Sequence, residues 1–308
     1  MMCYLIIQSR IIMSKDKKKR TTKKQVEYLK YSVGIDISKD KFDVNISVID
    51  ISQYVKVIAS RSFNNTESGY KLYIEWIQRK CKLGLPIVHT MEATGIYYEK
   101  LAWFLHRTDE HLSVVLPNKA KKYLQSLGLK SKNDKIDAKG LARMGAEQKL
   151  ERWKAPGENI VRLRNITRHR EQLTITKTQI SNQLHALKYG EYVDEKLIEQ
   201  QESIIAILET QIEETLDMIQ EVIDNDSVLK EKVEKITTIK GLGIVSVATV
   251  IAETNEFVYF TNQRQLVSYC GYDVVENQSG KHVGKTKISK RGNAHIRTEK
   301  SGKLFVII

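Results

Sequence analysis

The stretch Val33-Gly34-Ile35-Asp36-Ile37-Ser38 decides the fold, because it sets one acidic residue inside an apolar β-strand pattern. Val33, Ile35 and Ile37 alternate along it and make one apolar face. A carboxylate in such a strand is costly unless it has a partner or a chemical role. Asp36 is therefore the first candidate for a functional residue, although it also fits a turn before Lys39.

Strand and helix patterns alternate on the C-terminal side of this stretch. Apolar residues alternate at 42–48 and recur at 55–58, so three consecutive short strands predict an antiparallel meander. The following pattern predicts two more strands, at 86–89 and 111–116, and helices over 66–80, over 97–107, from Pro117, and over 134–148. A meander followed by alternating helices and strands indicates a mixed α/β sheet.

The rest of the chain has a different periodicity. Trp153 to Gly157 resembles a boundary, and helical spacing then runs over about 159–188 and 192–224, which predicts a helical hairpin or coiled coil suited to dimerisation. The sequence thus divides into four parts: a disordered basic arm at 1–30, an α/β catalytic domain at 31–152, a helical segment at 153–226, and a small, mostly α domain at 227–308.

Composition restricts the class of partner. The chain has a net charge of +13, which favours a polyanion such as nucleic acid, although a merely basic surface protein has the same charge. Its three cysteines lack a CxxC spacing, so a reducing cytoplasm is expected. No apolar run is long enough to span a membrane, so no membrane partner is expected. Met13 is a candidate start, because a polar tail begins there.

Three further carboxylates stand out by their position. Glu92 follows the strand at 86–89, whereas Asp134 and Asp137 lie three residues apart at a helix start and share one face. Clustered carboxylates repel one another unless a cation is bound, and Mg²⁺ prefers oxygen ligands. Singly, each residue also fits a helix cap or a partner for the helix dipole. A nucleotide-dependent kinase-type fold stays an alternative, although no Walker-type loop is present.

At this point the ordered motifs match a known family. Gly34 to Lys39, Met91 to Gly95 and Lys132 to Ala138 resemble the DEDD transposases of bacterial insertion sequences, the bridge-RNA-guided serine recombinases of insertion-sequence family one hundred and ten. The C-terminal half adds similar segments, at Ile239 to Gly243, Gln265 to Tyr272, Gln278 to Lys281 and Lys287 to Asn293. The resemblance covers about residues 32–297.

The resemblance implies a fold, a chemistry and partners. The first domain would be RuvC-like, with an RNase H-like fold, and Asp36, Glu92, Asp134 and Asp137 would bind Mg²⁺ or Mn²⁺. Ser279 would be the nucleophile that joins DNA. A structured guide RNA would choose donor and target DNA, and the protein would act as a homodimer or homotetramer in the bacterial cytoplasm.

The C-terminal residues fit this chemistry by themselves only in part. A serine needs activation, and Ser279 is followed by basic residues able to hold phosphate: Lys281, Lys285, Lys287, Lys290 and Arg291. A basic surface loop has the same pattern, and Ser289 is a local rival. Gly241 and Gly243 would offer backbone amides to nucleic-acid phosphate, or would only make a tight turn between helices.

The chain departs from the family pattern after Arg297. The residues from Thr298 to Ile308 end in an apolar run, where the family continues into further helices, so a truncated C-terminal domain is expected. The sequence therefore predicts a Mg²⁺-dependent transposase. Two alternatives remain: a RuvC-like junction nuclease that uses water, and an inactive nucleic-acid-binding relic.

Overall fold

The structure is a computed structural model that describes residues 26–93, 95–128, 134–258, 260–276, 278–279 and 282–298. The chain divides into two compact units, with the boundary between Ala155 and Pro156. The expectations for a basic N-terminal arm, a start at Met13 and a divergent end after Thr298 concern residues that lie mainly outside the described ranges.

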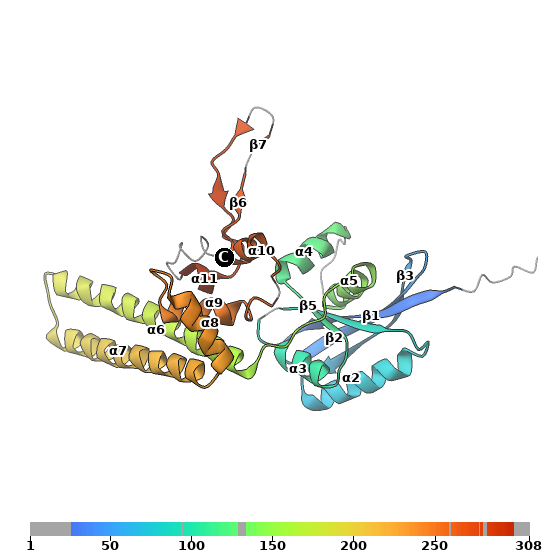
Figure 1. The fold of residues 1–308 in the computed structure, drawn as a ribbon, viewed down its shortest axis with the longest axis horizontal. Coiled ribbons are helices and arrows are strands. Elements are labelled where there is room, and N and C mark those ends of the chain that lie inside the picture. Colours follow the sequence, from blue (N-terminus) through green and yellow to red (C-terminus); the bar gives the residue numbers. More distant parts are fainter. Residues whose placement is uncertain are drawn as a thin grey trace, which may run out of the picture. The chain divides into compact units, whose positions relative to one another are not determined.

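The first unit is built on a five-stranded mixed sheet (Figure 1). Its order is β3-β2-β1-β4-β5, with β2 antiparallel to both β1 and β3, and with β4 parallel to β1 and β5. This is the mixed α/β sheet that the sequence predicts, with a three-strand antiparallel meander followed by two parallel strands. The strands are β1 (Tyr28–Ile37), β2 (Lys41–Asp50), β3 (Val55–Asn64), β4 (Ile87–Glu92) and β5 (Leu112–Val115).

The first strand begins earlier than the sequence suggests. Tyr28 pairs with Asp50 of β2, so residues 28–30 belong to the sheet and not to the basic arm. The Lys30 ammonium donates to the carbonyl oxygen of Gly145 at 2.7 Å, which draws this part of the strand toward a covering helix. This start was not predicted, because the alternating apolar pattern begins only at Tyr31 and the preceding residues 14–25 are rich in lysine and threonine.

One face of the sheet is apolar and packs on two helices, α2 (Glu67–Lys80) and α3 (Glu99–Arg107). Figure 1 shows both helices on the same side of the sheet. Alternation along the strands supplies the core, which includes Val33, Ile35 and Phe42, each without exposed surface. Burial of these side chains provides the main stabilisation of the unit.

The opposite face carries small and polar residues and is covered by α5 (Asp134–Glu147), next to α4 (Pro117–Ser126). A Cβ on Gly34 would lie 2.0 Å from the carbonyl oxygen of Ala138 and 2.1 Å from the amide nitrogen of Ala142. Both atoms are α5 backbone. The missing side chain therefore lets the helix approach β1 next to Asp36.

Gly34→Ala is expected to destabilise the first unit by about 2–4 kcal/mol, because the helix backbone must move away from the strand. Urea unfolding measures this loss. Gly157→Ala is the matched control, because the nearest atom to its added Cβ would lie 4.0 Å away. Equal stability of the two variants would contradict the close approach of α5.

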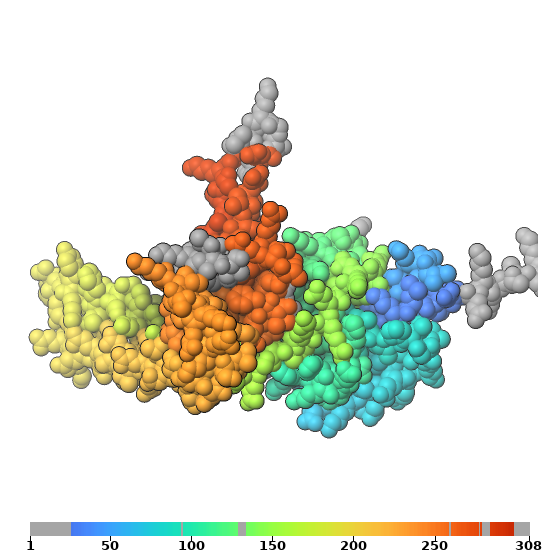
Figure 2. Space-filling view, viewed as in Figure 1, coloured from blue at the N-terminus to red at the C-terminus, as the bar shows by residue number. Residues whose placement is uncertain are grey.

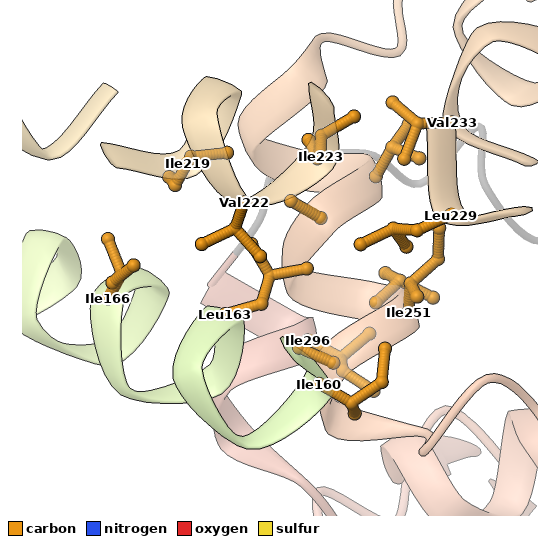
Figure 3. Packing of buried hydrophobic residues seen from close by; sticks show 14 of the residues in the cluster. Ile160, Leu163, Ile166, Ile219, Val222, Ile223, Leu229, Val233, Ile251 and Ile296 are labelled. Carbon is orange, nitrogen blue, oxygen red and sulfur yellow. The ribbon is translucent and has the colours of Figure 1, made fainter. Parts of the chain in front are cut away.

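The second unit is helical. Two long helices, α6 (Glu158–Tyr189) and α7 (Glu195–Asp224), pack against each other as the predicted hairpin, and four shorter helices adjoin its base: α8 (Ser227–Thr237), α9 (Ile244–Glu253), α10 (Gln263–Cys270) and α11 (Ala294–Thr298). Figure 3 shows how Leu163, Val222 and Ile251 meet in the shared core. The hairpin is thus fixed to the C-terminal helices by apolar packing.

A narrow arm, which the structure describes at residues 273–276, 278–279 and 282–289, extends from the C-terminal helices (Figures 1 and 2). It contains two antiparallel pairs of two-residue strands: β6 (Val274–Val275) with β9 (Lys287–Ile288), and β7 (Gln278–Ser279) with β8 (His282–Val283). The paired strands were not predicted from the sequence, and they lie within the small, mostly α C-terminal domain that it does predict. In the described ranges, no helix is long and apolar enough to cross a membrane.

Candidate active site at the edge of the sheet

Two of the candidate carboxylates end neighbouring parallel strands. Asp36 is the penultimate residue of β1, and Glu92 is the last residue of β4. The preceding residues, Ile35 and Met91, are partners in the parallel register. Because parallel strands end at the same edge, both carboxylates lie at one edge of the sheet. This edge is the place where open α/β sheets bind ligands.

The other two candidates come from the first turn of α5. Asp134 is its first residue and Asp137 follows one turn later. The close contact between Ala138 and Gly34 brings this turn to the end of β1. The structure therefore places all four predicted carboxylates at the same part of the sheet edge.

The pKa of Asp36 reflects the nearby carboxylates. Burial, and then the charges of Asp137, Asp134 and Glu92, raise the pKa of Asp36 to about 7. Asp36 is thus a half-buried carboxylate whose ionisation the neighbouring acidic residues oppose. A divalent cation would relieve that repulsion, and the all-oxygen donor set fits Mg²⁺ or Mn²⁺.

The four carboxylates are not arranged as the ligands of one bound metal ion. Within the described ranges, no three acidic, histidine or cysteine side chains lie close enough together to hold a metal ion. Asp134 instead accepts a contact from the ammonium of Lys41, at 3.1 Å. The donor chemistry of the edge therefore fits a divalent cation, but one carboxylate is held by a lysine.

Sequence reasoning missed two residues of this site, Lys41 and Asp43. Asp43 lies opposite Asp36 in the antiparallel register of β1 and β2, and its charge also raises the pKa of Asp36. Asp43 is only 3% exposed, whereas its neighbour Lys41 lies at the start of the strand. The short turn at 38–40 was the available signal, because it pairs the last residues of one strand with the first of the next.

The predicted nucleophile lies on the arm. The backbone of Ser279 pairs with His282 in the β7–β8 ladder, but its side chain lies outside what the structure describes, as does the whole of Lys281. The other predicted basic residues are exposed and form no ion pair with a described residue: Lys285, Lys287, Lys290 and Arg291. These charges are available to phosphate.

The rival serine at the base of the arm has a structural partner. The hydroxyl of Ser289 donates to Asp273 Oδ1 at 2.5 Å, and its backbone N–H donates to the carbonyl oxygen of Asp273 at 2.8 Å. These two bonds join the ends of the arm. Ser289 therefore closes the arm instead of presenting a free hydroxyl.

The glycine motif forms the turn between α8 and α9. Gly241 has a φ of 95°, in the left-handed region that favours glycine. Gly243 precedes α9 as its N-cap, and its missing Cβ would meet no atom within 4 Å. The turn is therefore open on one side, as contact with a phosphate requires, but the geometry equally suits a plain helix–helix turn.

Comparison with known proteins identifies the family. A family model described as "Transposase" matches residues 33–187, half of the chain, and another, described as "Transposase IS116/IS110/IS902 family", matches residues 233–299. The chain belongs to this transposase family. The predicted resemblance is confirmed, with a DEDD nuclease-type domain and with DNA as the partner that membership implies.

Curated relatives resemble the transposase over most of their length. The pilin gene-inverting protein of Moraxella bovis is 26% identical over 269 residues, which cover 86% of this chain and 79% of the relative. The transposase for insertion sequence element IS1111A of Coxiella burnetii is 23% identical over 305 residues, covering 92% and 78%.

Two solved structures resemble the transposase in fold alone. RuvC of T. thermophilus in complex with a Holliday junction substrate is 12% identical, with a TM-score of 0.29, covering 38% of this chain and 93% of that one. The fowlpox virus Holliday junction resolvase is 16% identical, with a TM-score of 0.27, covering 37% and 94%.

The transposase also contains a buried carboxylate far from the sheet edge in sequence. Glu253, at the end of α9, accepts two bonds from Arg168 of α6, at 2.6 and 2.9 Å, and one from the amide of Asn293, at 2.6 Å. Burial raises the pKa of Glu253, but the bonds from Arg168 and Asn293 outweigh it and hold that pKa below its usual range. Sequence reasoning missed this group, which joins the hairpin to the segment after the arm.

Proposed function

We propose that this transposase cuts and rejoins DNA with Mg²⁺ or Mn²⁺ held at the sheet edge. The observation that carries the proposal is the convergence of four carboxylates at the ends of β1 and β4 and the start of α5, where burial and the neighbouring charges raise the pKa of Asp36 to about 7. Such a perturbed group at the edge of a sheet is typical of a catalytic site. Asp36, Glu92, Asp134 and Asp137 are the proposed ligands.

The bound ions would supply charge stabilisation at the phosphate and activation of the attacking oxygen. The residues of the chain provide the frame for this chemistry. Asp36 and Glu92 are fixed by neighbouring strands, whereas Asp134 and Asp137 depend on the close packing of α5 at Gly34. Rigid elements of this kind keep ligands in place without reorganisation during the reaction.

Ser279 is the proposed nucleophile. Its hydroxyl oxygen would attack a DNA phosphorus, so that one Oγ–P bond forms as one P–O bond of the strand breaks. The hydroxyl loses its proton, and the departing sugar oxygen gains one. The proposal rests on the family match around Ser279 and on the exposed cations that follow it, Lys285, Lys287 and Arg291.

A guide RNA and self-association complete the proposal. The net charge of +13 favours a polyanionic partner, as a guide RNA would be. Self-association as a homodimer or homotetramer is supported by apolar side chains left exposed on α7, such as Ile204 and Ile207. The bacterial cytoplasm is the proposed location. The names of the relatives suggest inversion or insertion of DNA as the outcome.

A reconstituted reaction tests this function. Purified transposase is mixed with DNA that carries the ends of its element, with and without Mg²⁺, and with and without RNA transcribed from the flanking DNA. Rejoined DNA is expected only when both are present. Equal joining without RNA would reject guidance, and cleavage that persists in excess EDTA would reject the metal site.

A further inference from the structure

Lys41 connects the second strand of the sheet to the first turn of α5. Its ammonium lies 3.1 Å from Asp43 Oδ2 and 3.1 Å from Asp134 Oδ2. Asp43 is on β2 and Asp134 begins α5. One lysine therefore binds a sheet carboxylate and a proposed metal ligand at the same time.

The anchor on the strand side is rigid. Asp43 is 3% exposed, and its other carboxylate oxygen accepts a bond from the hydroxyl of Ser62 on β3. The backbone carbonyl of Lys41 is fixed as well, because it accepts from the N–H of Ser38 at 2.9 Å and from the hydroxyl of Ser38 at 2.8 Å. Both the stem and the charged end of Lys41 are thus positioned by the meander.

The contact on the helix side is weaker and open to solvent. The side chain of Asp134 is 56% exposed, and that of Lys41 is 51% exposed. An ion pair between exposed groups contributes little free energy, so a divalent cation can displace it. Asp43 stays paired with Lys41 when Asp134 leaves, which avoids an orphaned buried charge.

We infer that Lys41, anchored by Asp43, is a built-in cation that holds Asp134 in the metal-free transposase and releases it to a divalent cation. This inference rests on the proposed metal site. It makes Lys41 a positioning residue with two effects. It keeps the first turn of α5 docked before the ion arrives, and it lowers the affinity of the edge for that ion by charge repulsion.

Two readouts test the inference, and neither needs DNA cleavage. The first is a calorimetric titration of Mn²⁺ into the full chain. The second is hydrogen exchange of the backbone amides of residues 138–142 in EDTA. Lys41→Gln removes the cation, whereas Lys41→Arg retains it. Lys39→Gln is the charge-matched control, because Lys39 is exposed in the preceding turn and makes no ion pair with a described residue.

Lys41→Gln is expected to bind Mn²⁺ roughly three- to tenfold more tightly than the wild type and Lys39→Gln. Its α5 amides are expected to exchange several-fold faster, with Lys41→Arg close to the wild type in both readouts. An unchanged or weaker affinity in Lys41→Gln, or unchanged exchange, would overturn the inference. Absence of Mn²⁺ binding in the wild type itself would reject the proposed metal site, and this inference with it. Binding in the wild type without the expected change in Lys41→Gln would reject this inference alone.

Discussion

Asp36→Asn is expected to lower Mg²⁺-dependent DNA strand cleavage by about 10³-fold or more. The change removes the charge of Asp36 while keeping the shape of its side chain, so the proposed metal site would lose one of its ligands. A loss of about 4 kcal/mol in transition-state stabilisation corresponds to this factor. Nicking of a labelled substrate under single-turnover conditions measures it.

Asp40→Asn provides the matched control for this loss. Asp40 lies four residues after Asp36 and is exposed in the turn between β1 and β2. Its substitution therefore removes the same charge from the same part of the chain. Its cleavage rate is expected to stay within about twofold of the wild type, as for a surface change away from any special contact. Equal losses in both variants would show that net charge, and not the site, controls cleavage.

Asp36→Asn is also expected to stabilise the metal-free fold at high pH. Asp36 has a pKa of about 7 in the folded chain and 3.8 as its ordinary value, so the folded state binds the extra proton between these values. The free energy of unfolding that protonated Asp36 contributes is therefore lost as the pH rises from about 4 to 7. Above pH 7 the ionised carboxylate destabilises the fold by the full amount. A divalent cation would offset that cost.

Urea unfolding in EDTA measures the effect. Asp36→Asn is expected to exceed the wild type by about 1–2 kcal/mol at pH 8, after discounting for solvent screening, and by little at pH 4. A variant no more stable than the wild type at pH 8 would contradict the crowding of carboxylates around Asp36.

Ser279→Ala is expected to abolish the covalent protein–DNA adduct, because no other hydroxyl of the arm is proposed to attack. Denaturing gels of reactions with labelled DNA detect the adduct. Ser289→Ala should keep most of it, since the hydroxyl of Ser289 is already bonded to Asp273. Cleavage that proceeds unchanged in Ser279→Ala would instead support a junction nuclease that uses water.

The alternating pattern around Asp36 was enough to predict the sheet, because burial on one face leaves a period of two in the sequence. Glu92 and Asp134 stood out because they lie at the end of a strand and the start of a helix, and Asp137 because it follows Asp134 by one turn. Lys41 and Asp43 escaped prediction for a physical reason. Their role depends on which residues the turn at 38–40 sets opposite each other, and hydrophobic periodicity does not give that register.

The C-terminal unit shows where local patterns carry less information. Two-residue strands such as β7 are too short for a periodic signal, so the arm could not be predicted. Glu253 ends the apolar helix α9 and looks like an ordinary last-turn residue. Its carboxylate is bonded to Arg168 and Asn293, which are distant in sequence. Long-range pairing of this kind needs the folded structure.

A calorimetric titration of Mn²⁺ into the wild type and Asp36→Asn at pH 8 tests the central claim most directly. The claim is that carboxylates from β1, β4 and α5 form one divalent-cation site. The wild type is expected to bind the ion with an affinity that Asp36→Asn reduces at least tenfold, while Asp40→Asn leaves it unchanged. The same affinity in the wild type and Asp36→Asn would contradict the claim.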